Sequence, residues 1–354
     1  MSLNIKSLST IGWEPFLQQQ LTTDEWEQVS PYRVIAVHRG QLLLSNGEDE
    51  VTFTLSGKIL TEDRMNHATI GDWLLLSNAD GKFIRMLERK SLFKRKAPGT
   101  ANLHQLIAAN VNTLFIVTSA NEEFSISRIE RYLALAYEAK AEPVVIITKV
   151  DLSEDIDQYT ENVRKLDAFL VVETVNALDP KSLNKLHSWC KSGQTIALMG
   201  SSGVGKSTIA NGLGTPVQKT GKIRDDDAKG RHTTTHRSLL PLNEGGILLD
   251  TPGMRELQVT DCEDGVAAVF ADIEELSANC RFNDCKHNNE PGCAVKSALE
   301  SEQLDPRRLS NYNKLQAEQR RNSATLAERR HKDKKLSKFY SRTIKESQKL
   351  KGMS

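Results

Sequence analysis

A loop that binds phosphate groups is indicated by the glycines and the lysine between Gly200 and Ser207, which fit the pattern G-x-x-x-x-G-K-[ST]. In such a loop, glycines let successive backbone N–H groups point at phosphate oxygens. Lys206 would reach the β- and γ-phosphates in a catalytic role, and the Ser207 hydroxyl would bind Mg²⁺. The alternative is a glycine-rich turn without a ligand, but a strand-like run precedes the pattern and a helix-like run follows it. The predicted nucleotide contacts in this segment are Gly200, Ser201, Ser202, Gly203, Val204, Gly205, Lys206, Ser207 and Thr208.

A second phosphate-side element is predicted at Asp250 and Gly253, which follow another strand-like run in the pattern D-x-x-G. In nucleotide hydrolases with this pattern, the aspartate supports Mg²⁺ and the glycine N–H contacts the γ-phosphate. Four residues of this type carry little weight alone. They gain weight from their place downstream of a phosphate loop.

Guanine recognition is predicted at Thr148, Lys149, Val150 and Asp151, which resemble the pattern [NT]-K-x-D at the end of a strand-like run. The Asp151 carboxylate can accept hydrogen bonds from the N1–H and N2 amino groups of guanine, whereas adenine offers no such pair of donors. The Lys149 stem would lie over the base. The alternative is a strand end in which the lysine is solvated and the aspartate caps a helix.

A metal site is predicted at Cys280, Cys285, His287 and Cys293. Three thiolates and one imidazole fill a tetrahedral shell with no open position for water, which favours a structural Zn²⁺ ion. Free buried thiols and a transient disulfide are the alternatives. The zinc would stabilise a small domain that is too poor in apolar residues to fold alone.

A parallel sheet is needed to position these motifs, and the sequence after residue 98 predicts one. Strand-like runs alternate there with helix-length segments, which is typical of a parallel sheet with helices on both faces. Upstream, short apolar runs separated by turn residues indicate a small β-barrel, with an OB-fold, an SH3-like barrel and a meander as alternatives. Strands are expected at residues 32–37, 41–44, 51–55, 72–76, 83–87, 113–117, 144–148, 169–172, 196–200 and 247–250, and helices at 127–139, 160–167, 181–190 and 206–213.

The motif order is unusual, because the guanine reader precedes the phosphate loop, whereas in most GTPases it comes last. All three motifs follow strands, so a parallel sheet would place them along one edge. Relocating the chain ends keeps that edge intact. The sequence therefore predicts a multidomain α/β protein with a circularly permuted P-loop GTPase domain. The expected parts are an N-terminal extension at 1–30, an OB-fold β-barrel at 31–97, the permuted GTPase domain at 98–260, a helical zinc-binding domain at 261–305 and a basic tail, helical or disordered, at 306–354.

Charge is distributed unevenly along the chain. The whole sequence has 47 Lys and Arg against 46 Asp and Glu, yet residues 306–354 carry 15 Lys and Arg against 4 Asp and Glu. A basic tail on an acidic body favours a polyanionic partner such as RNA, and a solvated charged face is the alternative. No apolar run approaches the roughly 20 residues that cross a bilayer, and the first residues lack the pattern of a secretory signal. We therefore expect a cytoplasmic protein without a membrane partner.

The combination resembles the family of the ribosome small-subunit-dependent GTPase A, RsgA or YjeQ-type. The resemblance covers nearly the whole chain and includes residues 105–111, the permuted motif order, the cysteine cluster and residues 230–235, which are similar to the family's switch I. It implies hydrolysis of GTP to GDP, stimulated by the 30S subunit late in its maturation. It also implies an OB-fold and a zinc domain. We further expect contact with 16S rRNA, one Zn²⁺ ion, Mg²⁺ bound with GTP, and a monomer.

The residue that orients the attacking water is expected to be unusual. Ras-like enzymes have glutamine after D-x-x-G, but here the position is Met254, which cannot hydrogen-bond usefully to water. The family resemblance offers His232 in switch I as the catalytic residue, and an exposed histidine without a role is the alternative. Thr234 is the expected switch I ligand of Mg²⁺, with Thr233 and Thr235 as close competitors.

Two other functions stay open on the sequence alone. One is a non-enzymatic assembly factor that binds rRNA and uses nucleotide as a structural ligand. The other is a metabolic kinase that uses ATP, against which the Asp151 carboxylate argues.

Overall fold

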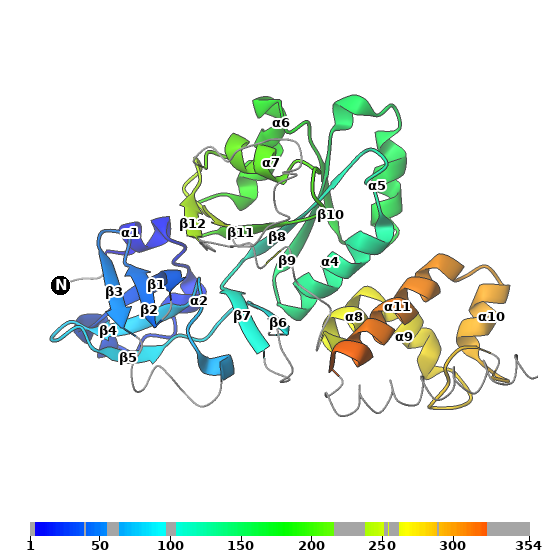
Figure 1. The fold of residues 1–354 in the computed structure, drawn as a ribbon, viewed down its shortest axis with the longest axis horizontal. Helices are drawn as coiled ribbons and strands as arrows, with labels where there is room; N and C mark the ends of the chain where they lie inside the picture. Colours follow the sequence, from blue (N-terminus) through cyan, green and yellow to red (C-terminus); the bar gives the residue numbers. More distant parts are fainter. Residues whose placement is uncertain are drawn as a thin grey trace, which may run out of the picture.

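The computed structural model describes residues 4–38, 40–54, 64–96, 104–215, 238–250, 254, 262–288 and 290–323. It contains an N-terminal antiparallel sheet, a central sheet covered by helices and a C-terminal group of helices (Figure 1). In these ranges, no helix combines the length and apolar character needed to cross a membrane. The expected switch I residues His232 and Thr234, the expected phosphate contact Gly253 and the tail beyond residue 323 lie outside the described residues.

Six strands form the central sheet in the order β10-β9-β8-β11-β13-β12. The strands are β8 (Thr113–Ser119), β9 (Glu142–Thr148), β10 (Val171–Thr174), β11 (Thr195–Met199), β12 (Ser238–Pro241) and β13 (Ile247–Asp250). All neighbours run parallel except β12, which is antiparallel to β13. Parallel neighbours need long crossover connections, and helices supply them.

Two helical layers cover the two faces of this sheet. The helices are α4 (Ile126–Glu138), α5 (Ile156–Arg164), α6 (Pro180–Leu183), the 3-10 helix η4 (Asn184–Trp189) and α7 (Lys206–Gly212). Val145 and Ile147 of β9 belong to the buried cluster on the α4 and α5 side, whereas Val144 and Ile146 belong to the cluster on the α6, η4 and α7 side. Burial on both faces explains why the strand is a continuous apolar run. The expected parallel sheet with helices on both faces is confirmed.

The N-terminal sheet has five strands in the order β3-β2-β1-β4-β5, and every neighbouring pair is antiparallel. Its elements are α1 (Ile5–Thr10), α2 (Pro15–Gln18), α3 (Glu25–Gln28), β1 (Val29–His38), β2 (Gln41–Ser45), β3 (Glu50–Thr54), the 3-10 helix η2 (Arg64–Asn66), β4 (Trp73–Ser77) and β5 (Phe83–Met86). All five expected strands are present. A bulge between Val34 and Ala36 interrupts the register of β1, and bulges of this kind bend a strand.

A buried arginine joins this sheet to the central one. Arg33 of β1 is fully buried, and its guanidinium donates hydrogen bonds to the Ile11 carbonyl at 2.6 Å, the Asn110 carbonyl at 3.2 Å and the Thr195 hydroxyl at 2.9 Å. Burial lowers the pKa of Arg33 to about 10. Because Thr195 begins β11, the contact ties β1 to the strand that leads to the predicted phosphate loop.

A hairpin that the sequence analysis did not anticipate lies between the two sheets. Its strands, β6 (Leu92–Lys96) and β7 (His104–Ala109), pair antiparallel on either side of the expected boundary at residues 97 and 98. The Leu92 N–H donates to the carbonyl of Ala139 at 2.9 Å, just after α4. The hairpin therefore bonds to the central unit through β6.

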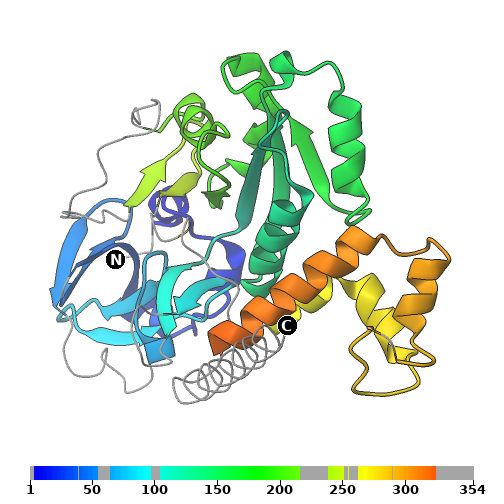
Figure 2. The same ribbon diagram turned by 45° about the vertical axis from the view of Figure 1, so that its right-hand side comes forward.

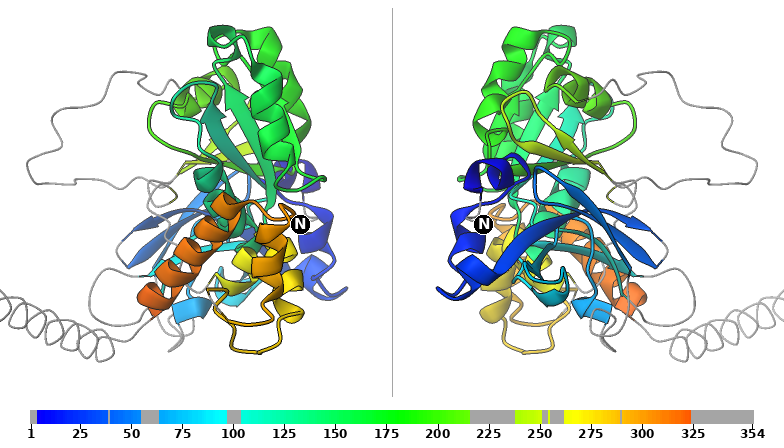
Figure 3. Two further views of the ribbon diagram at one scale, coloured as in Figure 1. Left: turned by 90° about the vertical axis from the view of Figure 1, so that its right-hand side faces the viewer. Right: turned by 90° about the vertical axis from the view of Figure 1, so that its left-hand side faces the viewer.

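The C-terminal helices pack beneath the central sheet in the view of Figure 3. They are α8 (Glu263–Val269), α9 (Ala271–Ala278), α10 (Ala294–Glu300) and α11 (Pro306–Ser323). Helix α8 lies so close to α4 that a Cβ atom on Gly265 would be 2.0 Å from the Ala134 carbonyl oxygen. The long helix α11 passes beside α4 and α8 (Figure 2). It buries Leu309 and Leu315, so residues 306–323 contribute more to the core than the sequence analysis expected.

A network of charged side chains fixes α11 to α4. Glu130 of α4 is fully buried, and its carboxylate accepts hydrogen bonds from Arg307 at 3.0 Å, Arg308 at 3.1 Å and the side-chain amide of Asn311. Arg308 also forms a bidentate pair with Asp272 at 2.7 and 2.8 Å. A buried carboxylate needs such partners, because an unpaired charge in the interior is costly.

Candidate functional site

The predicted guanine reader and the predicted phosphate loop meet at the carboxyl edge of the central sheet. Thr148, the last residue of β9, is fully buried, and its hydroxyl donates to the Val204 carbonyl at 2.6 Å. The same oxygen lies 3.0 Å from the Thr118 carbonyl of β8. One hydroxyl therefore connects two motifs that are far apart in the sequence, and the expected convergence at one edge is confirmed.

The backbone of the phosphate loop requires glycine at two points. At Gly200 a Cβ atom would lie 2.2 Å from the Val117 carbonyl oxygen, so a side chain there would collide with β8. Gly205 has φ +97°, in the left-handed region that favours glycine, directly before α7. These two constraints hold the loop against the sheet while the chain turns into the helix.

Lys206 folds back over the loop that precedes it. Its ammonium group donates to the Gly200 carbonyl at 2.8 Å and to the Ser201 carbonyl, and the residue is 9% exposed. Ser207 and Thr208, in the same first turn of α7, are half-buried. The loop carbonyls thus hold the ammonium group at the N-terminus of α7, where it could contact phosphate oxygens.

The reader loop turns away from the sheet directly after Thr148. Lys149 has φ +58°, and the 3-10 helix η3 (Val150–Leu152) follows. Asp151 is exposed, so its carboxylate faces solvent on the open side of the edge. The arrangement leaves this carboxylate accessible to an incoming base.

Asp250 ends β13 at the same edge, two strands from β8 in the sheet order. It is half-buried and stands opposite Ser238 of β12 in the strand register. The carboxyl ends of β9, β11 and β13 therefore bring the reader, the phosphate loop and Asp250 to one side of the sheet.

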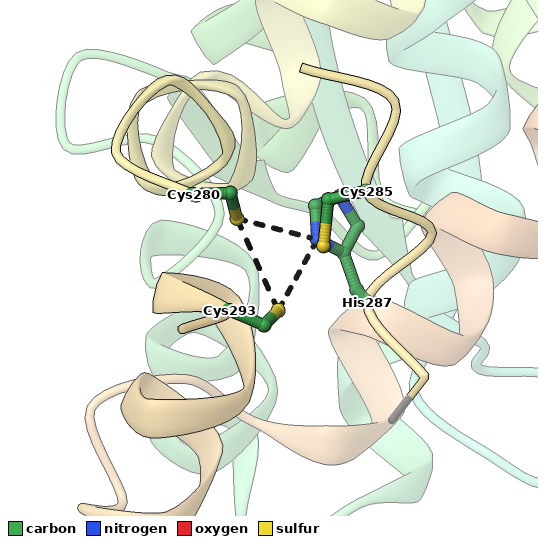
Figure 4. A group of neighbouring side chains, drawn as sticks. All are labelled: Cys280, Cys285, His287 and Cys293. Atoms are coloured by element: carbon green, nitrogen blue, oxygen red, sulfur yellow. Dashed lines mark hydrogen bonds between the residues drawn. The ribbon is translucent and has the colours of Figure 1, made fainter. Parts of the chain in front are cut away.

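The four predicted metal ligands converge in the C-terminal unit (Figure 4). Their ligand atoms all lie within 4.8 Å of one another. The Cys280 and Cys293 sulfurs are 3.9 Å apart, and His287 Nδ1 lies 3.7 Å from the first and 3.5 Å from the second. Tetrahedral zinc with bonds of about 2.3 Å to sulfur separates two sulfurs by about 3.8 Å. The residues therefore fit a tetrahedral metal ion.

The surroundings of this cluster also suit a metal ion. Burial opposes ionisation of Cys280, but hydrogen bonds from the backbone N–H groups of Val295 and Ala294 and from the neighbouring thiols together lower the pKa of this thiol. On the other side of the ring, His287 Nε2 lies 3.1 Å from the Ser277 hydroxyl. A partner at the second ring nitrogen orients a metal-binding histidine.

Ser277 is the residue of this site that sequence reasoning missed. It lies in the last turn of α9, and Cys280 follows just beyond the end of that helix. No local pattern in the sequence marks this serine as a partner of His287.

Comparison with known proteins identifies the family. The model of the family described as RsgA GTPase matches residues 86–260. A relative from Vibrio parahaemolyticus, named small ribosomal subunit biogenesis GTPase RsgA 2, is 53% identical over 333 residues, which cover 94% of this chain and 91% of the relative. The chain belongs to the RsgA GTPase family. Another RsgA, named small ribosomal subunit biogenesis GTPase RsgA, from Mesorhizobium japonicum, is 44% identical over 321 residues, with 90% and 91% coverage.

Solved structures of similar fold support the RsgA architecture. YjeQ from Thermotoga maritima matches with a TM-score of 0.58 at 24% identity and covers 81% of this chain and 97% of its own. YloQ, described as a circularly permuted GTPase, matches with a TM-score of 0.56 at 23% identity and covers 82% and 94%. The predicted circular permutation of the GTPase domain is confirmed by this likeness of fold.

Membership of the RsgA family makes the protein a GTP hydrolase, as the sequence predicted. The four predicted ligands form a group that could hold a metal ion. The individual roles of the nucleotide contacts, of His232 and of Thr234 stay predictions.

Proposed function

We propose that the protein binds GTP at the carboxyl edge of the central sheet and hydrolyses it to GDP and phosphate. The observation that carries this proposal is the 2.6 Å hydrogen bond from Thr148 to the Val204 carbonyl, which sets the base reader beside the phosphate loop. Asp151 would accept the two guanine donors, and Lys206 would exchange its loop carbonyls for the β- and γ-phosphates. Ser207 and Asp250 would support Mg²⁺.

The attacking water would be oriented from switch I. Met254 is 2% exposed and packs in the main buried cluster, so its side chain does not offer a polar group to the nucleotide. We therefore retain His232 as the proposed catalytic residue and Thr234 as the proposed Mg²⁺ ligand, with Gly253 contacting the γ-phosphate. Water attack would depend chiefly on positioning and on charge stabilisation.

The proposed partner is the small (30S) ribosomal subunit, through its 16S rRNA. Two relatives that cover about nine-tenths of this chain are named small ribosomal subunit biogenesis GTPases. The net positive charge of residues 306–354 suits rRNA phosphates. The protein would act as a cytoplasmic monomer late in subunit maturation, with the N-terminal sheet and the C-terminal unit as the binding parts.

A hydrolysis assay tests the enzyme and the partner together. GTP turnover is measured alone and with 30S, 50S or 70S particles, for the wild type, Lys206→Ala and the control Lys191→Ala, an exposed lysine whose backbone forms an isolated β-bridge with Gly245. We expect acceleration with 30S particles, normal turnover in K191A and none in K206A. Turnover by K206A at the wild-type rate would remove Lys206 from the mechanism. Equal rates with and without 30S particles would contradict stimulation by the small subunit, and no turnover under any condition would favour the non-enzymatic assembly factor.

We also propose that the Cys₃His group holds one structural Zn²⁺ ion. Metal analysis of purified protein should find about one zinc per chain, and Cys285→Ser should lose it. The control Asp284→Asn changes an exposed neighbour outside the ligand set and should keep the metal. Full zinc content in C285S would contradict the assignment.

A further inference from the structure

An arginine outside the recognised motifs reaches the phosphate loop from α4. Arg128 lies in the first turn of α4, and its Nη1 donates to the Ser201 hydroxyl at 2.6 Å. The same nitrogen donates to the Glu123 carboxylate at 3.0 Å. Ser201 is the second residue of the phosphate loop, so this contact acts on the loop itself.

Ser201 is held from two directions. Its hydroxyl accepts from Arg128, while its carbonyl accepts from Lys206. Lys206 also donates to the Gly200 carbonyl at 2.8 Å. Arg128 thus holds the start of the loop through the Ser201 side chain, and Lys206 holds it through the backbone carbonyls.

Hydrogen bonds anchor the part of α4 that carries Arg128. Ser125 begins α4 as its N-cap, and its side chain accepts from the Arg128 backbone N–H. Two residues further on, buried Glu130 is bonded to Arg307 and Arg308 of α11. A side chain that must hold another group in place needs a backbone anchored in this way.

We propose that Arg128 is a positioning residue that holds Ser201, and with it the phosphate loop, in the geometry that binds nucleotide phosphates. This inference rests on the proposed binding of GTP at this edge. The contact involves the hydroxyl of Ser201 and no nucleotide atom, so it strengthens the binding of GTP and of GDP to the same extent. Its loss raises KM and leaves kcat almost unchanged, which is the pattern for uniform binding.

The test compares two replacements of Arg128. Arg128→Met keeps an unbranched stem and removes the charge and the donors, whereas Arg128→Lys keeps a cation that can donate to both Ser201 and Glu123. A third variant, Ser201→Ala, removes the acceptor and leaves the arginine. The matched control is Arg164→Met, an exposed arginine of α5 away from the loop. Affinities for GDP and GTP, kcat, KM and the thermal unfolding temperature without nucleotide are measured for each.

We expect R128M and S201A each to weaken both nucleotides about five- to tenfold, with kcat within about twofold of the wild type. The double variant should be no weaker than either single one, because both remove the same contact. R128K should recover most of the affinity, and R164M should match the wild type. Unfolding temperatures should agree among all variants, since Arg128 is exposed.

Three results would overturn the proposal while leaving GTP binding intact. Wild-type affinity in R128M would show that the contact does not matter. If S201A has normal affinity while R128M binds weakly, the charge of Arg128 acts without the hydrogen bond to Ser201. Equal losses in R128M and R164M would show a general effect of net charge. A wild-type protein that binds neither GDP nor GTP would instead remove the proposed function, and this inference with it.

Discussion

At the scale of single residues, Thr148 decides how the nucleotide edge is assembled. It is a β-branched residue that suits the end of a buried strand, and its hydroxyl bonds to the Val204 carbonyl of the phosphate loop. A hydroxyl carries a single proton, so the Thr118 carbonyl 3.0 Å away cannot receive it at the same time. The connection between reader and phosphate loop therefore depends on one donor.

Replacing Thr148 with valine removes this donor and keeps the shape of the side chain. We expect Thr148→Val to lower the free energy of unfolding by about 1–3 kcal/mol, because the buried Val204 carbonyl is left without its partner. GTP affinity should fall as well. Chemical denaturation and nucleotide binding measure the two effects.

A matched control is Thr160→Val, since the Thr160 hydroxyl donates to the Ile156 carbonyl within its own helix, α5. It should cost less and leave nucleotide binding unchanged. If T148V proves as stable as the wild type and binds GTP normally, Thr148 does not join the two loops.

Spacing alone predicted the reader, the phosphate loop and the metal ligands, because each has a pattern tied to its chemistry, and the structure brings the residues of these patterns together. It could not locate Arg128 or Ser277. Their roles depend on which side chain an element presents to a neighbour far along the chain, and no local pattern marks that. The sequence therefore predicts groups that bind ligands better than groups that support them.

At the scale of elements, short helices hold the N-terminal sheet through ion pairs. Glu25 of α3 forms a bidentate pair with Arg85 of β5 at 2.8 and 2.9 Å. The hydrogen bond from Arg85, aided by the backbone N–H of Thr22, lowers the pKa of Glu25 from its ordinary value of 4.5 to about 2. The pair therefore persists at acidic pH values at which a free glutamate carboxylate is already protonated.

This pair predicts a pH dependence of stability. The folded protein binds fewer protons at Glu25 than the unfolded chain, so the pair's contribution is fully present above pH 4.5 and is lost as the pH falls toward about 2. In Glu25→Gln the loss of stability over that window should be smaller than in the wild type. Denaturation curves at several pH values measure it.

The exposed neighbour Glu27 offers the control, because Glu27→Gln should keep the wild-type pH profile. Identical profiles for E25Q and the wild type would show that the pair between α3 and β5 does not contribute to acid stability.

The strands of both sheets except β12 were predicted, because apolar runs of their length leave a clear pattern. Strand β12 was missed, because its sequence SLLP is a short run that ends in proline. The helices α1, α2 and α3 were not, because elements of four to six residues are too short to show helical periodicity. The hairpin of β6 and β7 was missed because its strand LFKRK mixes basic and apolar residues. For α11, the buried partners of Arg308 lie on other helices, and the sequence of α11 alone does not reveal them.

At the scale of the whole molecule, α4 belongs to two units at once. One side covers the central sheet, and the other accepts α8 and α11. Glu130 is the centre of the second contact, with its side chain fully buried among donors from α11. The C-terminal unit is therefore attached to the GTPase domain through a carboxylate as well as through apolar packing.

Neutralising this carboxylate should loosen the attachment. We expect Glu130→Gln to lower the free energy of unfolding by about 3 kcal/mol, because the buried guanidinium of Arg308 loses one of its anionic partners. Proteolysis within α11 should become faster at the same time. Denaturation and timed digestion measure these effects.

Glu300→Gln is the comparison, since Glu300 pairs with Lys296 at 3.8 Å on an exposed surface. Such a pair contributes less than about 1 kcal/mol. If E130Q and E300Q behave alike, the network around Glu130 does not hold α11 in place.

The guanidinium of Arg33 limits how the protein can be divided. It donates hydrogen bonds to the carbonyls of Ile11 and Asn110, which lie before β1 and between β7 and β8. It also donates to the hydroxyl of Thr195, the first residue of β11. A shortened protein that begins at the GTPase domain would expose the start of β11, and one that lacks only the first dozen residues would deprive the buried guanidinium of its acceptor at Ile11. The N-terminal sheet is thus no detachable module, and functional work on the nucleotide edge belongs on the intact chain.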